Sequence, residues 1–307
     1  MTQTITKNEL TLARAYKMCR AIARREAKNF YYAFVALPAE RRDAICAVYA
    51  FMRQADDLAD DESHSIAKRR EMLDRWFDEW DAVCRGASTL NPAFLALRDA
   101  VAKFHIPLNL LDELVAGVAM DVAHEAGSPE RYETFKELYR YCYLVASVVG
   151  LVCIRIFGYR DLRAERLAEE TGIAFQLTNI LRDVAEDAAR NRVYIPLKDL
   201  AAHKITVESL LRRRPGAPPN AEERRLLAGM GRRAEKYYSS AWQLLPLIDG
   251  ESRPALWVLV TVYHSLLKRI ERSDYDVFTR RASVPTVTKM GILAVGMMRM
   301  AWARVFG

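Results

Sequence analysis

Acidic side chains gather in two short segments of the chain. The first segment, DDLADD at 56–61, is termed the first acidic cluster. Asp56 and Asp60 stand four residues apart, so on a helix both carboxylates project from one face, about one turn apart. The same spacing counted backwards places Arg53 and Tyr49 close to that face. Acidic helix ends are also common on solvated surfaces, so this cluster does not define a site by itself.

The second segment, QLTNILRDVAED, carries polar side chains at regular helical spacing. Asn179, Asp183 and Asp187 fall at i, i+4 and i+8, and they are termed the second acidic cluster. Carboxylates one turn apart repel each other and destabilise an isolated helix by about 0.2–0.5 kcal/mol. A cation should therefore lie beside them. An arginine, either Arg53 or Arg182, is one candidate, and a metal ion is the other.

Both clusters offer carboxylate or amide oxygens, and neither contains His or Cys. Such hard donors favour Mg²⁺, with Mn²⁺ as the alternative, over Zn²⁺. In proteins Mg²⁺ is usually held by a few carboxylates together with phosphate oxygens of the substrate. On a diphosphate the ion neutralises the charge of the leaving group, and the allylic cation left behind needs an apolar pocket with aromatic faces. The candidate metal ligands are Asp56, Asp60, Asn179, Asp183 and Asp187.

Helical periodicity surrounds both clusters. Gly (13) and Pro (11) are scarce for 307 residues, which favours helices over an all-β fold. We expect an all-α fold in one domain over 1–307, with a surface loop at 212–220 and an amphipathic C-terminal helix at 287–307. The other expected helices are Leu10–Phe34, Ala39–Leu58, Ile66–Cys84, two beginning at Asn91 and Ile106, Tyr132–Phe157, Asp161–Ala189, Glu222–Leu245 and Pro254–Arg272.

Composition and charge exclude several other classes of protein. The formal net charge of +7 suits anionic partners, but no zinc-finger or basic-zipper pattern appears, so nucleic acid is not an expected partner. The five cysteines are widely spaced without a CxxC, which argues against a disulfide framework and a zinc site. The N-terminus lacks the apolar core of a signal peptide, so we expect a cytoplasmic protein.

The C-terminal stretch 287–306 comes nearest to a membrane-binding segment. It is apolar but interrupted by Lys289, Arg299 and Arg304, so it does not read as a span. Two interpretations stay open. The helix either lies on the inner face of the membrane as a peripheral contact or packs on the body of the protein.

Taken together, YAFMRQADDLAD (49–60) and QLTNILRDVAEDAARNRVYIP (176–196) resemble the squalene/phytoene synthase family. The similarity runs from Tyr16 to Phe278. Lys28-Asn29-Phe30 stands where the family has a Ser-rich diphosphate-binding segment. In this segment the side chain of Asn29 can still hydrogen-bond phosphate, but that of Ala27 cannot. The helix with Tyr141, Val145 and Val149 resembles the family's pocket-lining helix, although spacing alone favours plain core for these three residues.

The resemblance implies a helical bundle of the isoprenoid synthase type with a central cavity. It implies that the two acidic clusters handle Mg²⁺ and diphosphate, that Tyr141 faces the reacting carbons and that Arg53 takes part in catalysis. The residues it places around the substrate are Lys28, Asn29, Phe30, Phe34, Tyr49, Val145, Val149, Gln176, Asn179, Arg182, Arg192 and Tyr194.

The expected reaction is the head-to-head condensation of two farnesyl diphosphates through presqualene diphosphate. The enzyme would then form squalene with hydride from NADPH, or stop at presqualene diphosphate. Phe34 would favour farnesyl over geranylgeranyl diphosphate if it closes the cavity. The alternatives are a phytoene synthase acting on geranylgeranyl diphosphate, a class I terpene cyclase, and a catalytically silent assembly or membrane-associated relative. A cyclase ladder usually continues with Ser or Thr and then Glu, and a silent relative should have lost acidic ligands that this chain retains.

Overall fold

The computed structural model of the chain describes residues 10–124, 132–214 and 216–306. Within these ranges the regular elements are helical, and an isolated β-bridge joins Tyr159 to Ile248. The predicted all-α class is therefore confirmed. In chain order the elements are α1 (Leu12–Glu26), α2 (Lys28–Val35), α3 (Ala39–Ala59), α4 (Ile66–Cys84), α5 (Pro92–Phe104), α6 (Leu108–His124), α7 (Phe135–Cys142), the π-helical turn η1 (Tyr143–Ser147), α8 (Val148–Phe157), α9 (Arg163–Ala189), α10 (Leu197–Ala202), α11 (Val207–Leu211), α12 (Ala221–Leu244), the 3₁₀ turn η2 (Leu245–Leu247), α13 (Arg253–Arg272) and α14 (Thr286–Phe306).

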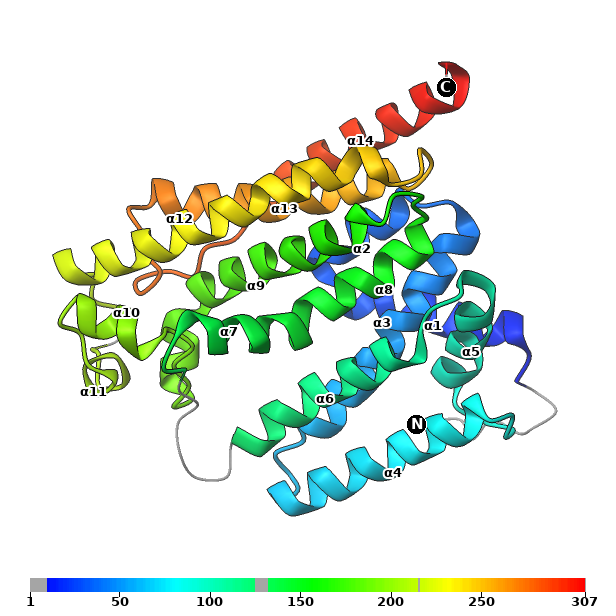
Figure 1. Cartoon of the computed structure of the whole chain (residues 1–307), viewed down its shortest axis with the longest axis horizontal. Coiled ribbons are helices and arrows are strands. Elements are labelled where there is room, and N and C mark those ends of the chain that lie inside the picture. The colour runs from blue at the N-terminus through cyan, green and yellow to red at the C-terminus, as the bar shows by residue number, and fades with distance from the viewer. Residues whose placement is uncertain (1–9, 125–131, 215, 307) are drawn as a thin grey trace.

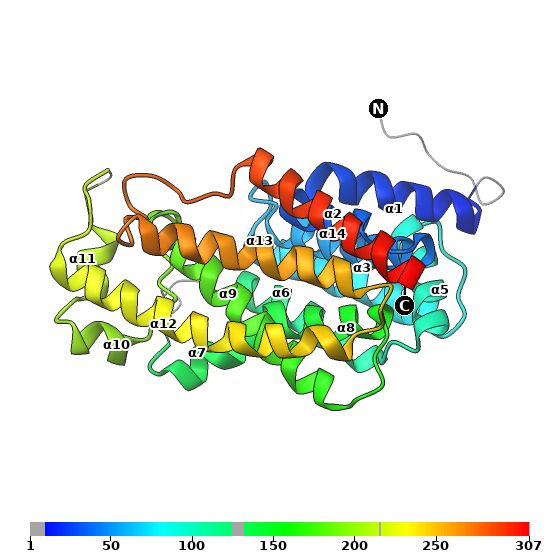
Figure 2. The same ribbon diagram turned by 90° about the horizontal axis from the view of Figure 1, so that it is seen from above.

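Helix α9 lies in the middle of the bundle. Helices α12 and α13 pack on one side of it, and α7 and α8 pack on the other, with α6 covering α8 (Figure 1). Helix α3 packs on α1, α5 and α6 and also contacts α8. Because α8 contacts both α3 and α9, it joins the two helices that carry the acidic clusters. Seen from above, α14 runs beside α13 and α2 (Figure 2).

The N-terminal helix predicted over Leu10–Phe34 is wrong as a single element. The chain turns at Ala27, which is buried and closes α1 through its N–H bond to the Ala23 carbonyl, 2.9 Å away. The turn lets α1 pack on α3 and α5 while α2 packs on α13, where Ala33 meets Val258 and Val262. One straight helix could not contact both groups of partners.

The long helix predicted over Tyr132–Phe157 begins at Phe135 and is interrupted by η1. The π-helical turn presses against α9: a Cβ added to Gly172 would lie 2.5 Å from the Cα of Ser147, and the Ser147 hydroxyl donates to the Glu169 carbonyl at 2.7 Å. Such turns insert an extra residue and shift the helical phase. Side chains before and after η1 therefore point in directions that an unbroken α-helix would not give.

The stretch Phe135–Phe157 is long and apolar enough to cross a membrane by length and composition, and 44% of its most apolar window is buried. It packs between α6 and α9, which is the position of a core helix. Core helices pass the same test, so this finding is weak evidence for a membrane span.

Beyond α9, the chain adds α10 and α11 before the expected loop at 212–220. The described residues of that loop are not helical, and Arg213 pairs with Glu223 in the first turn of α12 at 2.9 Å. The C-terminal segment forms α14, which packs on α13 and α2.

Candidate active site

The second acidic cluster lies along one face of α9, while the apolar residues of the same stretch face the core. Ile173, Leu177 and Leu181 are inaccessible to solvent, whereas Asn179 and Asp183 are half-buried. The apolar residues hold α9 in the core, and the helical period then directs the polar side chains to the same side. The polar face is therefore built on a rigid element.

Two arginines supply positive charge beside the carboxylates of the second acidic cluster, as their mutual repulsion led us to expect. The Arg182 Nε donates to Asp183 Oδ1 at 2.7 Å and a second guanidinium nitrogen contacts Oδ2, so this predicted partner is found. Arg281 also donates from Nε to Asp183 Oδ1 at 2.9 Å, and it reaches Glu186 at 3.1 Å. Arg281 was not among the residues predicted from the sequence, although it stands only three positions after Phe278, where the family-like stretch ends.

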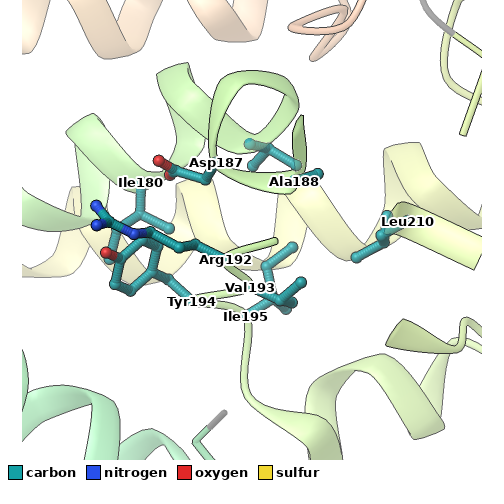
Figure 3. A pocket seen from close by; sticks show the side chains of 9 residues that line it. Ile180, Asp187, Ala188, Arg192, Val193, Tyr194, Ile195 and Leu210 are labelled. Atoms are coloured by element: carbon teal, nitrogen blue, oxygen red, sulfur yellow. The ribbon is translucent and has the colours of Figure 1, made fainter. Parts of the chain in front are cut away.

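Asp187 stands at the end of the second acidic cluster, beside a narrow pocket (Figure 3). Burial, together with the nearby Asp183, raises the pKa of this carboxyl to about 7, although Arg192 acts in the opposite direction. The backbone N–H of Arg192 donates to the Asp187 carbonyl at 2.8 Å, so the chain turns sharply after α9. The turn returns Arg192 and Tyr194 to the pocket that Asp187 lines.

Asn179 offers an amide oxygen that has no protein partner among the described residues. Its Oδ1 is buried without a hydrogen bond, while its Nδ2 donates to Gln176 Oε1 at 3.4 Å. A buried acceptor without a partner is costly, and a cation would satisfy it. The donor set of Asn179, Asp183 and Asp187 therefore fits a hard metal ion. In the described part of the chain, no three His, Cys, Asp or Glu side chains are close enough to hold one ion by themselves.

The first acidic cluster lies at the C-terminal end of α3. The helix ends at Ala59, and the Asp60 N–H donates to the Asp56 carbonyl at 2.8 Å. Its last turn has no basic residue, although the negative end of the helix dipole disfavours carboxylates there. Arg53 pairs with the exposed Asp57 at 2.5 Å. The Arg69 guanidinium also donates to the Ala59 carbonyl at 2.7 Å, so cationic side chains offset part of the negative charge at this end of α3.

A cavity of about 570 Å³ opens between α2, α3, α9, α13 and the start of α14. It brings together four predicted substrate contacts, Phe30, Tyr49, Asn179 and Arg182. Its remaining described lining was not predicted: Glu26, Ala27, Tyr32, Tyr263, Leu266, Arg281, Ala282, Ser283, Val284 and Lys289.

Tyr263 connects the polar and aromatic parts of this cavity. Its ring stacks on Phe175 with centroids 4.4 Å apart and packs against Phe30 at 5.5 Å. Burial raises the pKa of Tyr263 to about 12, while Arg182 and a hydrogen bond with Asn179 act in the opposite direction. The hydroxyl is therefore protonated at neutral pH. From the sequence, Tyr263 is indistinguishable from an ordinary core aromatic residue of α13.

Several predicted residues do not belong to the described lining of this cavity. Phe34 is buried and meets the ring of Tyr49 edge-on at 6.2 Å. Tyr141 stacks on Tyr194 at 5.1 Å and packs against Tyr132 at 5.6 Å, which makes a buried tyrosine cluster. Val145 in η1 and Val149 in α8 are half-buried, and Gln176 accepts from Asn179. Lys28 and Asn29 begin α2, and their side chains lie outside the described part of the structure.

The fold and site match a known family. A family model described as squalene/phytoene synthase matches residues 23–288. The chain belongs to the squalene/phytoene synthase family. Among curated relatives, it is 35% identical to a phytoene synthase from Arthrospira platensis over 94% of each chain. It is 32% identical to a 15-cis-phytoene synthase from Synechococcus elongatus, again over 94% of each chain.

Solved structures of this family share the fold. A dehydrosqualene synthase crystallised with a ligand superposes with a TM-score of 0.82 at 26% identity, covering 95% of this chain and 98% of that one. Squalene synthase HpnC from Alicyclobacillus acidocaldarius gives a TM-score of 0.77 at 28% identity, with 86% and 96% covered. The predicted isoprenoid synthase bundle and the predicted enzyme class, a prenyltransferase of the squalene/phytoene synthase type, are confirmed.

Proposed function

We propose that this enzyme is a phytoene synthase that joins two geranylgeranyl diphosphates head to head. The observation that carries the proposal is the 35% identity to a phytoene synthase over 94% of both chains. Because the curated relatives reported above are named phytoene synthases, they favour geranylgeranyl diphosphate as the substrate. The sequence had led us to expect the shorter farnesyl diphosphate. Proton loss from the final cation gives a desaturated product, so this reaction needs no NADPH.

The position of Phe34 supports the longer substrate. A shorter prenyl chain was expected if this ring closed the cavity. Phe34 instead packs behind Tyr49, and the described lining of the cavity contains Tyr49 but not Phe34. The reason for preferring farnesyl diphosphate is thereby removed.

The chain's own residues would divide the work between the two ends of the substrate. Asp56, Asp60, Asn179, Asp183 and Asp187 would hold Mg²⁺, with Mn²⁺ as the alternative, which when bound neutralises the charge of the departing diphosphate. Arg182 and Arg281 bring guanidinium groups to the same place and suit bidentate binding of phosphate oxygens. For Arg281 this means exchanging Asp183 for the diphosphate.

The aromatic lining would serve the carbon skeleton. Phe30, Tyr49 and Tyr263 present rings to the cavity, and ring faces stabilise a carbocation without reacting with it. Val284 and Leu266 add apolar surface that excludes water, which would otherwise capture the cation.

Product analysis tests the proposal. Purified enzyme receives geranylgeranyl or farnesyl diphosphate with Mg²⁺, with and without NADPH. We expect a Mg²⁺-dependent coupled hydrocarbon from geranylgeranyl diphosphate that does not require NADPH, and its loss in Asp183→Ala. Asp161→Ala is the matched control. Asp161 is also an aspartate paired with an arginine, Arg163, but it lies just before α9 and outside the second acidic cluster.

The other outcomes contradict the proposal in distinct ways. Coupling of farnesyl diphosphate alone would return the enzyme to the dehydrosqualene or squalene type. A cyclised product from one substrate molecule would place it with the terpene cyclases. An absence of turnover of either substrate would support a silent relative.

A further inference from the structure

The connection between α13 and α14 forms part of the cavity wall although it is not helical. It comprises residues 273–285, is termed the connecting segment, and runs as an extended trace from the end of α13 to the start of α14 (Figure 2). Its second half lines the cavity with residues 281–284, and Arg281 pairs with Asp183 at 2.8 Å. The position of Arg281 is therefore set by the contacts that hold a non-helical segment in place.

The first half of the connecting segment is fixed to α12. A Cβ added to Gly231 of α12 would lie 2.6 Å from the hydroxyl of Tyr275, so this tyrosine lies tightly against that helix. Asp276 accepts from the backbone N–H of Phe278 at 3.3 Å. Phe278 stands at the end of this fixed half, only three positions before Arg281. A shift of the Phe278 ring would therefore move the backbone from which Arg281 reaches the site.

Arg213 contacts the ring of Phe278 from the loop that precedes α12. Its guanidinium carbon lies 3.7 Å from the centroid of the ring, which is the geometry of a cation–π contact. The Arg213 side chain is only 13% exposed, so water screens this contact weakly.

The guanidinium of Arg213 is itself held in one plane. Nε and Nη2 donate to the two carboxylate oxygens of Glu223 at 2.9 and 3.1 Å. Nη1 donates to the Ala217 carbonyl and Nη2 to the Pro218 carbonyl, each at 2.7 Å. A bidentate pair of this kind fixes the orientation of the guanidinium as well as its position. The flat face that meets Phe278 is therefore preorganised, and a lysine ammonium has no such face.

Arg213 does not belong to the described lining of the cavity. We propose that Arg213 is a positioning residue, which fixes the ring of Phe278 and thereby the place from which Arg281 binds the diphosphate. The inference rests on the proposed function of Arg281 as a phosphate ligand, but it is independent of the prenyl chain that the substrate carries. A residue that only stabilised the start of α12 would have no energetic link to Arg281.

A double-mutant cycle on the binding of inorganic diphosphate tests this link. Calorimetric titration of the full-length protein at saturating Mg²⁺ measures the dissociation constant. Arg213→Lys keeps the charge but loses the flat face, and we expect it to weaken binding about threefold to tenfold. Arg281→Ala should weaken binding about tenfold or more. The double variant should bind no more weakly than Arg281→Ala alone, because the effect of Arg213 acts through Arg281.

Variants of the other partner separate positioning from a general loss of structure. Phe278→Leu removes the ring and should weaken binding as Arg213→Lys does, whereas Phe278→Tyr keeps the ring and should bind like the wild type. Arg214→Ala is the matched control, because Arg214 is the next residue of the same loop and is exposed. This control should also bind like the wild type.

Several results would overturn the proposal. The wild type could fail to bind inorganic diphosphate, or Arg213→Lys and Phe278→Leu could bind it as tightly as the wild type. The losses in Arg213→Lys and Arg281→Ala could multiply in the double variant, which would show that the two residues act independently. Phe278→Tyr could bind as weakly as Phe278→Leu, which would show that the ring is not the link.

The two proposals fail in different ways. An enzyme that shows the expected coupling but joins no geranylgeranyl diphosphate contradicts the proposed function and leaves the role of Arg213 in place. An enzyme that forms the coupled hydrocarbon while all these variants bind inorganic diphosphate equally contradicts the role of Arg213 alone.

Discussion

Asp183 is the residue at which the electrostatics of the site meet. Arg182 and Arg281 both pair with it, from α9 itself and from the segment before α14. Two guanidinium groups on one carboxylate compensate the repulsion along the second acidic cluster. They also occupy the oxygens that a metal ion would use, so Arg281 and the metal compete for Asp183.

This competition makes a prediction for Arg281→Ala. We expect kcat/KM to fall about tenfold to a hundredfold and the KM for the diphosphate to rise, because one phosphate-binding guanidinium is lost. The Mg²⁺ concentration for half-maximal activity should fall, because Asp183 loses a competing cation. Steady-state kinetics with varied Mg²⁺ measures both, with the neighbouring exposed Arg280→Ala as control. Equal kinetics in the two variants would show that Arg281 has no role at the site.

At the scale of single elements, the contact between η1 and α9 shows how the helices are positioned. Gly172 is the point of closest approach, and the atoms facing it are backbone atoms of Ser147 and Ala146. Backbone cannot move aside as a flexible side chain can. The absence of a side chain at Gly172 therefore sets how closely the helix with the second acidic cluster lies to the interrupted helix with the tyrosine cluster.

Gly172→Ala should consequently destabilise the protein by about 1–3 kcal/mol through overpacking, despite the better helix propensity of alanine. Gly229→Ala is the control, since the nearest atom to its added Cβ is the flexible end of Arg232 at 3.8 Å. That variant should be neutral or more stable by about 0.5–1 kcal/mol. Urea unfolding followed by circular dichroism compares the two free energies of unfolding, and an unchanged stability for Gly172→Ala would refute the close approach.

At the scale of the whole molecule, Arg41 ties together segments that are distant in sequence. From α3 it donates to the Phe157 carbonyl and to the Ser252 hydroxyl, each at 2.5 Å, and it pairs with Asp249 at 2.9 Å. These groups lie at the end of α8 and before α13. The guanidinium therefore connects the helix of the first acidic cluster to two helices that border α9.

We expect Arg41→Ala to lower the free energy of unfolding by about 2–4 kcal/mol, because several hydrogen bonds to a charged group are lost at once and their acceptors stay partly buried. Arg42→Ala, at the next position on the same helix, should change it by about 0.5 kcal/mol or less. Thermal and urea denaturation measure both. Equal effects of the two substitutions would mean that the contacts of Arg41 contribute no specific stability.

Local patterns in the sequence were sufficient to predict the helical class, the family and the polar face of α9. Asn179, Asp183 and Asp187 could be placed on one face because the helical period acts over neighbouring residues. The same reasoning found Arg182, which is adjacent to Asp183. It failed at Ala27 and at η1, because local periodicity continues through both positions while packing against α13 and α9 interrupts the helix.

Contacts between distant segments were decided by the tertiary structure. Arg281 is 98 residues from Asp183, and no spacing rule joins them. Tyr263 and Lys289 reach the cavity because α13 and the start of α14 pack beside α2. Phe34 packs against Tyr49 and does not belong to the described lining. The types of residue available for the chemistry can thus be read from the chain, whereas the groups that meet around one cavity depend on packing, which acts between residues without regard to their separation in sequence.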